Sequence, residues 1–251
     1  MRVMTTRTSQ IGRAVRVLDL DPDLGRGLGD ADRARAAARL LAGVYEVEPG
    51  PWTIHEPATE GGAYGLLVMD GLVGLRTSIA DRATLELVGP GDLLQPWVQL
   101  GAEIVVPAET GWRVIDRTKL LLLDRAFAEA AADWPEITAA LMHRMVLRNR
   151  RLCYQLAVNT SPRIEERLLY TLWALAARWG RVTEEGTVIN LGLTHEQLAE
   201  LIAAQRPSVS TALGKLREQD RIAYGRDRFV LRGQIPGEVQ ALKRQVALSR
   251  L

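Results

Sequence analysis

Cysteine and histidine are scarce in this chain of 251 residues, which has one cysteine, Cys153, and three histidines. A single cysteine excludes an intramolecular disulfide and any metal cage or iron–sulfur cluster held only by cysteines of one chain. Long apolar runs are also missing, because none approaches the roughly 18 residues of a membrane-spanning helix and the N-terminal segment has no signal-peptide core. We therefore expect a cytoplasmic protein with no membrane partner.

The chain also has no strong excess of charge of one sign. It contains 32 Lys and Arg and 30 Asp and Glu, which gives a formal net charge of +2. From Ser161 onward, however, 14 Lys and Arg stand against 10 Asp and Glu. A polyanionic partner would have to meet a local basic patch, and the C-terminal part of the chain is the better place for one.

Short apolar segments separated by Gly, Pro and Asp follow a helix that we expect within 30–42. The strand candidates are 64–69, 72–77, 83–88, 103–106, 112–116 and 119–123. Short strands spaced about ten residues apart, with turn residues between them, are typical of an antiparallel sandwich or barrel. We expect turns at Asp70-Gly71 and at Gly91-Asp92.

A long helix is expected from Asp133, with Pro135 in its first turn, to a break at 159–162. The residues Met142, Met145, Asn149, Leu152 and Leu156 recur along it at spacings of three and four. Such spacing is that of a two-stranded coiled coil, in which one asparagine among apolar residues fixes the register and favours a dimer. In the alternative interpretation the helix packs on its own barrel and Asn149 faces solvent.

A helix-turn-helix pattern lies in residues 193–222, preceded by a helix expected at 163–179. Thr194 and Gln197 form a capping-box pattern that starts the first helix. Pro207 suits the first turn of a second helix, because a missing N–H costs nothing there. Any two tightly joined amphipathic helices give a similar pattern, but a hairpin candidate with several arginines follows at 222–231, as in a winged helix.

The N-terminal end of the second helix carries side chains that read DNA in this motif. Arginine bonds bidentately to guanine, and Ser, Thr or Gln bond bases or phosphates in the major groove. The candidate DNA-binding residues are Gln205, Arg206, Ser208, Ser210, Thr211 and Lys215 in the helix, and Arg226 and Arg228 in the hairpin.

The order of these parts resembles the cyclic-AMP-receptor/fumarate-nitrate-regulator (CRP/FNR) family of bacterial transcription factors. The segments SPRIEERLLYTLWALAARWG and AAQRPSVSTALGKLRE, and GLLVMDGLVGLRT with LELVGPGDLL, carry the resemblance. It implies an α+β fold with an N-terminal jelly roll, a long dimerisation helix and a C-terminal winged helix-turn-helix. It also implies that Arg206 is the main base-reading arginine and Thr211 a second reading position.

Two positions depart from the family's pattern. Pro207 stands where some members carry a base-reading glutamate, so the operator sequence does not carry over. Ala203 stands where many carry a turn glycine; if its φ is positive, alanine costs roughly 1 kcal/mol.

The family's effectors fit this sequence poorly. A cyclic phosphate needs an arginine after the Gly-Asp turn, and none occurs between Arg82 and Arg113. An iron–sulfur cluster needs more cysteines, and haem would depend on His55 or Cys153, each more typical of an ordinary side chain. The apolar segment 93–100 suits either a ligand pocket or strand packing, so the effector is unknown. We expect neither a cofactor nor a metal.

These observations predict a homodimeric regulator that binds palindromic double-stranded DNA, with RNA polymerase as a further candidate partner. The expected parts are an N-terminal tail (1–29), a sensor-like domain (30–132), the long helix and hinge (133–160), the DNA-binding domain (161–233) and a C-terminal tail (234–251). The alternative is a ligand-binding or protein-interaction module with a vestigial DNA-binding domain. An enzyme is not expected, because no nucleophile–base pair, metal spacing or phosphate-binding glycine loop is present.

Overall fold

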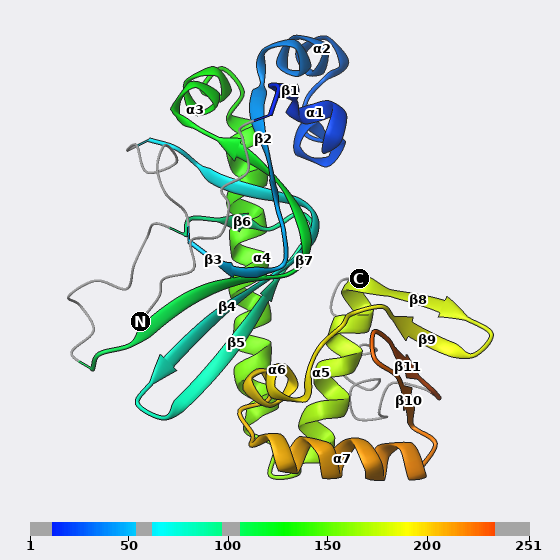
Figure 1. The fold of residues 1–251 in the computed structure, drawn as a ribbon. Coiled ribbons are helices and arrows are strands. Elements are labelled where there is room, and N and C mark those ends of the chain that lie inside the picture. The colour runs from blue at the N-terminus through cyan, green and yellow to red at the C-terminus, as the bar shows by residue number, and fades with distance from the viewer. Residues whose placement is uncertain (1–11, 54–61, 97–105, 234–251) are drawn as a thin grey trace. The chain divides into compact units, whose positions relative to one another are not determined.

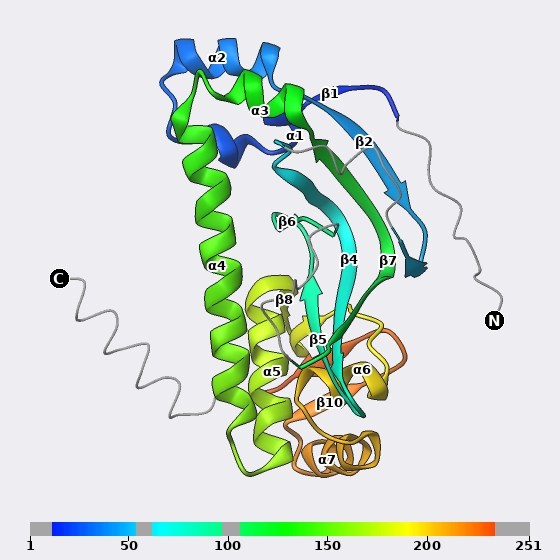
Figure 2. The ribbon, with the colours of Figure 1, turned by 90° about the vertical axis from the view of Figure 1, so that its left-hand side faces the viewer.

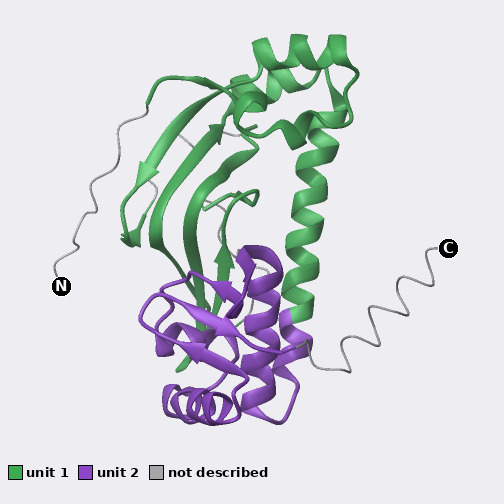
Figure 3. Ribbon diagram, turned by 90° about the vertical axis from the view of Figure 1, so that its right-hand side faces the viewer, with its two compact units in different colours: residues 1–154 green, residues 155–251 purple. Residues whose placement is uncertain are grey.

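The computed structural model describes residues 12–53, 62–96 and 106–233. The chain divides into two compact units between Tyr154 and Gln155, inside the long helix α4 (Pro135–Asn159), as Figure 3 shows. The expected C-terminal tail and nearly all of the strand expected at 103–106 lie outside the described residues.

The first unit contains an antiparallel sheet and the helices that pack on it (Figures 1 and 2). Its elements are β1 (Val15–Arg16), α1 (Val17–Leu20), η1 (Pro22–Gly25), α2 (Asp30–Arg39), β2 (Leu41–Val47), β3 (Gly50–Trp52), β4 (Gly65–Ile79), β5 (Arg82–Val88), β6 (Leu93–Leu94), β7 (Glu109–Leu123), α3 (Arg125–Ala131) and most of α4. The strand order is β1-β2-β7-β4-β5, with β3 also paired to β7 and β6 to β4. The expected antiparallel sheet is confirmed.

Two pairs of expected short strands are each one long strand. The segments 64–69 and 72–77 fall within β4, and 112–116 and 119–123 fall within β7. The expected turn at Asp70-Gly71 is therefore wrong: the register shifts there, as in a β-bulge, while the two strands stay paired. Gly71 has φ +88°, and a Cβ there would lie 2.6 Å from the Cα of Thr118, so only glycine fits the bulge.

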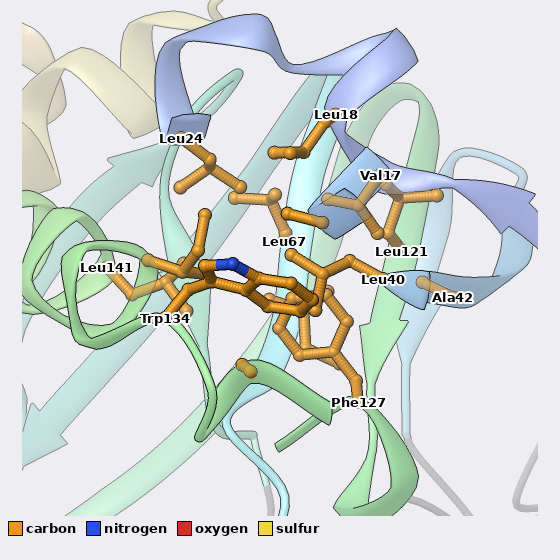
Figure 4. Packing of buried hydrophobic residues seen from close by; sticks show 14 of the residues in the cluster. Val17, Leu18, Leu24, Leu40, Ala42, Leu67, Leu121, Phe127, Trp134 and Leu141 are labelled. Carbon is orange, nitrogen blue, oxygen red and sulfur yellow. The ribbon is translucent and has the colours of Figure 1, made fainter. Parts of the chain in front are cut away.

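The end of β7 has four consecutive leucines because both faces of the sheet are covered by apolar residues there. Leu121 and Leu123 point to one core, and Leu120 and Leu122 to another, because successive side chains of a strand alternate between faces. Figure 4 shows the first core, in which Phe127 and Trp134 pack with Leu121. Both faces of the strand are thus buried.

The N-terminal segment contributes to this core from Val15 onward. Val17, Leu18 and Leu24 are buried, and β1 pairs with β2 (Figure 4). The expected tail at 1–29 is therefore wrong for residues 15–29. The elements in this segment are only two to four residues long, which is too short to show a strand or helix period in the sequence.

The second unit is a helical domain with a small antiparallel sheet. It contains the last turn of α4 and α5 (Ile164–Trp179), β8 (Gly180–Thr183), β9 (Gly186–Ile189), α6 (His195–Leu201), α7 (Arg206–Glu218), β10 (Ile222–Tyr224) and β11 (Phe229–Leu231). The strand order is β10-β11-β9-β8. The expected hairpin is present, but β8 was missed, because its exposed residues show no apolar alternation. Within the described residues, no helix is long and apolar enough to span a membrane.

Candidate nucleic-acid interface

The first helix of the pair, α6, begins where the capping box places it. The Thr194 hydroxyl accepts a hydrogen bond from the backbone N–H of Gln197 (3.2 Å), and the Gln197 side chain accepts one from the N–H of Thr194 (2.8 Å). Leu198 and Leu201 are buried on the inner side of the helix. These contacts fix both the start and the orientation of α6.

The turn between the helices is tight and strained at Ala203, which has φ +51°. The backbone N–H of Ala204 bonds to the carbonyl of Ala199 (2.9 Å), which closes the turn. The guanidinium of Arg167 on α5 lies 3.4 Å from the carbonyl of Ala203. Alanine thus occupies a conformation that glycine adopts at roughly 1 kcal/mol less cost.

The second helix, α7, starts abruptly at Arg206 because Pro207 occupies its first turn. Gln205 precedes it with extended backbone angles and makes no side-chain cap. Its inner side is buried through Val209, Ala212, Leu213 and Leu216. Five of the DNA-binding candidates therefore lie on the exposed part of one helix, and Gln205 directly precedes it: Arg206, Ser208, Ser210, Thr211 and Lys215.

Two of the three hydroxyls on α7 are hydrogen-bonded to the backbone of the helix itself. Ser210 donates to the carbonyl of Arg206 and Thr211 to that of Pro207, both at 3.2 Å. Arg206 is exposed, and its guanidinium has no hydrogen-bonded partner in the part of the chain that the structure describes. Arg206 is thus a long, positively charged side chain at the N-terminal end of α7 that is available for a ligand.

Lys215 is engaged with another helix. Its ammonium donates to the carboxylate of Glu165 on α5 at 2.6 Å, and this hydrogen bond holds the pKa of Glu165 below its ordinary value. Lys215 would therefore have to leave Glu165 or share its charge in order to bind a phosphate.

The hairpin β10–β11 presents its arginines in two ways. Arg226 is exposed in the turn. Arg228 donates to Glu185 at 2.6 Å, and Arg232 pairs with Asp220. Of the two predicted hairpin residues, Arg226 is thus the one without a carboxylate partner among the described residues.

Three further residues shape this region without having been predicted as DNA-binding residues. Nδ1 of His195 lies 2.9 Å from the Ser210 hydroxyl, so the start of α6 contacts α7. The Gln155 amide nitrogen at the end of α4 lies 3.1 Å from the Thr171 hydroxyl and 2.9 Å from the carbonyl of Leu201, and Asn159 approaches the same carbonyl. A capping box signals the position of His195, but nothing in sequence pairs Gln155 with Leu201.

The predicted coiled-coil residues lie together on an exposed face of α4. The exposed fractions are 65% for Met142, 40% for Met145, 38% for Leu152 and 69% for Leu156, and Asn149 is exposed among them. So much apolar surface on one helix is unusual for a monomer and is typical of an interface.

On another side of α4, three arginines bind carboxylates of the first unit; we call them the arginine ladder (Arg144, Arg148 and Arg151). Arg144 pairs with Asp21, Arg148 with Glu86 and Arg151 with Asp92. Arg148 also donates to the carbonyl of Leu93 at 3.1 Å. The ladder therefore reaches the Gly91-Asp92 turn and the strand after it.

Side chains that could bind a metal or a cofactor are few among the described residues. The described residues contain no group of three or more His, Cys, Asp or Glu that could hold a metal ion. Cys153 is exposed on α4, and His55 lies outside the described residues.

Comparisons with known proteins agree with this arrangement. Residues 166–232 match the sequence profile of the Crp-like helix-turn-helix domain. The chain is 29% identical over 144 residues to a CRP-like cAMP-activated global transcriptional regulator of Mycobacterium tuberculosis, an alignment that spans 56% of this chain and 62% of the relative.

Two solved structures share the fold. A CooA mutant from Carboxydothermus hydrogenoformans is 15% identical, with a TM-score of 0.61 over 94% of this chain and 97% of that one. FixK2 from Bradyrhizobium japonicum is 19% identical, with a TM-score of 0.59 over 76% and 93%. Residues 166–232 thus match a Crp-like helix-turn-helix domain, and the chain shares its fold with these two solved structures.

Proposed function

We propose that this protein is a homodimeric, sequence-specific DNA-binding transcriptional regulator without enzymatic activity. The observation that carries the proposal is the exposed N-terminal end of α7, where Arg206 has no hydrogen-bonded partner among the described residues and the exposed Ser208 and Thr211 follow within two turns. In this motif that end enters the major groove, where an arginine can bond to guanine. The proposed DNA-binding domain is 161–233.

The proposed dimer forms through the exposed apolar face of α4, from Met142 to Leu156. Two copies would present two recognition helices to half-sites about one helical turn (~34 Å) apart in a palindrome. Asn149 would fix the register of the two helices. Contact with RNA polymerase is a further proposal that rests on the likeness to transcriptional regulators alone.

Regulation by cyclic AMP is not part of the proposal, because the described residues do not fit a cyclic phosphate. No arginine follows the Gly91-Asp92 turn within 91–100. The arginines that reach this turn come from α4, and each is paired with a carboxylate. A bound phosphate would have to compete with these carboxylates for every guanidinium.

Selection of binding sites from random DNA, followed by fluorescence anisotropy on the selected palindrome, tests the proposal. Arg206→Ala should lose about 1–3 kcal/mol on the selected site and little on scrambled DNA, because it removes a base contact. Arg226→Ala is the matched control, since it should weaken both DNAs alike and reduce the salt slope by about 1. If Arg206→Ala binds and discriminates like the parent protein, the proposed base reading is wrong.

A second candidate function is a ligand-binding or protein-interaction module whose DNA-binding domain is vestigial. The observation that favours it is the pairing of Lys215 with Glu165 and of Arg228 with Glu185, which neutralises much of the basic surface. Such a protein would bind DNA only weakly, with no preferred site, and salt would abolish the binding.

A further inference from the structure

A glycine lies inside the recognition helix, at a position where helices rarely contain one. Gly214 belongs to α7 (Arg206–Glu218) and is more than one turn from either end. Glycine is the least favourable residue in a helix interior after proline, because it loses the most backbone freedom on folding. A reason for its presence is therefore required.

The free protein supplies no such reason. Gly214 is not among the residues with positive φ, so its backbone angle does not require glycine. A Cβ built on it would meet no atom of the described residues within 4 Å, whereas a Cβ on Gly71 would lie 2.6 Å from a backbone atom. The buried side of α7 is formed by other residues, including Val209 and Leu213. Among residues 12–53, 62–96 and 106–233, neither packing nor backbone conformation requires glycine here.

Gly214 lies on the same exposed side of α7 as some of the DNA-binding candidates. It follows Thr211 by three residues and Pro207 by seven, so the three lie on the same side of the helix. Thr211 and Pro207 are exposed, and Lys215 is the next residue. A side chain at 214 would extend from the surface on which the recognition helix carries its candidate base-reading residues.

We propose that Gly214 is a close-approach position: the missing side chain lets the middle of α7 come near the DNA while Arg206 reads bases at its N-terminal end. The inference rests on the proposed function, because it needs DNA in contact with this side of α7. Backbone that approaches a ligand closely is a recognised use of glycine. The residue sets how deeply the helix enters the groove and contacts no base by a side chain of its own.

The proposal predicts opposite signs for stability and for binding. In the full-length chain, Gly214→Ala should raise the thermal midpoint by roughly 4 °C and slow hydrogen exchange in α7, because alanine favours the helix. On the selected palindrome it should weaken binding at least about tenfold, and Gly214→Gln should weaken it further. The matched control is Ala177→Gly at an exposed position of α5, which should lower the thermal midpoint and leave DNA affinity unchanged.

Each outcome decides the proposal. If Gly214→Ala gains stability and binds DNA as tightly as the parent protein, the close approach is wrong while the proposed function stands. If Gly214→Ala loses stability, the glycine serves the free helix and the inference is overturned. If the parent protein selects no DNA sequence, the proposed function fails and the inference falls with it.

Discussion

Arg148 of α4 and Glu86 of β5 form a two-point ion pair, with Nε 2.6 Å from Oε1 and Nη2 2.7 Å from Oε2. The side chains are only 14% and 16% exposed. Burial alone would lower the pKa of Arg148, but the hydrogen bond and the charge of Glu86 raise it, so the guanidinium stays charged. This largely buried ion pair thus connects the middle of α4 to the sheet.

Removing one partner of this pair should destabilise the first unit strongly. Arg148→Ala leaves the Glu86 carboxylate buried without its partner, and we expect a loss of about 3–5 kcal/mol in the free energy of unfolding, measured in urea. Arg150→Ala, at an exposed position of the same helix, is the control and should change stability by less than about 0.5 kcal/mol.

The double variant Arg148→Met/Glu86→Leu should recover most of that loss, because two apolar side chains leave no uncompensated charge. An Arg148→Ala protein as stable as the parent would show that the pair contributes no net stability.

The strain at Ala203 predicts a stabilising substitution. Ala203→Gly should raise the free energy of unfolding of the second unit by about 1 kcal/mol, because φ +51° disfavours a Cβ. Ala204→Gly is the control: its φ is not positive, so glycine should bring no gain. Equal gains from both substitutions, in urea unfolding followed by circular dichroism, would mean that the strain at Ala203 is not the cause.

Charges on the exposed face of α4 should dissociate the proposed dimer. Leu156→Glu places a carboxylate where the apolar side chain is 69% exposed, and we expect at least about 30-fold weaker dimerisation in sedimentation experiments. Leu147→Glu introduces the same charge at another exposed leucine, which the helical period places on a different side, and should remain dimeric. If Leu156→Glu stays dimeric, the proposed interface on this face of α4 is wrong.

The pair between Lys215 and Glu165 predicts a pH dependence. The pKa of Glu165 is below 4.5, first because of the hydrogen bond from Lys215, so its stabilising effect is complete above pH 4.5 and disappears as the pH falls through the lower folded value. Lys215→Ala should raise the pKa of Glu165 in an NMR titration and remove part of this acid-dependent stability.

The internal control for this titration is Glu166, whose pKa is lowered first by the Ser161 hydroxyl. Its titration should move much less than that of Glu165 in Lys215→Ala, because only the charge of Glu165 connects it to the lysine. If the pKa of Glu165 does not move, the lysine is not its main partner in solution.

Features encoded by neighbouring residues could be predicted from sequence. Pro135, Pro207 and the capping box at Thr194 each mark a helix start, because the missing N–H or the side-chain cap acts within one turn. The exposed end of α7 follows from these starts and from the apolar spacing. The candidate DNA-binding residues were for this reason accessible from sequence.

Features that join distant segments could not be predicted. Asp70-Gly71 has the composition of a turn, and only the pairing of Asp70 with Lys119 of β7 shows that it is a bulge within β4. The partners of the arginine ladder come from three separate segments, and Gln155 reaches residues of α5 and α6. The spacing of apolar residues in the sequence does not indicate such pairs, because each pair forms only when distant segments come together in the fold.

The single cysteine is exposed, so it offers one site for attaching a spectroscopic label. Cys153 lies on α4 beside Leu152, and no other thiol competes for a maleimide or a nitroxide reagent. In the proposed homodimer, one label on each copy would give a single intermolecular distance across the pair of long helices. Pulsed electron resonance could then follow the spread of those helices with and without DNA, in the unaltered sequence.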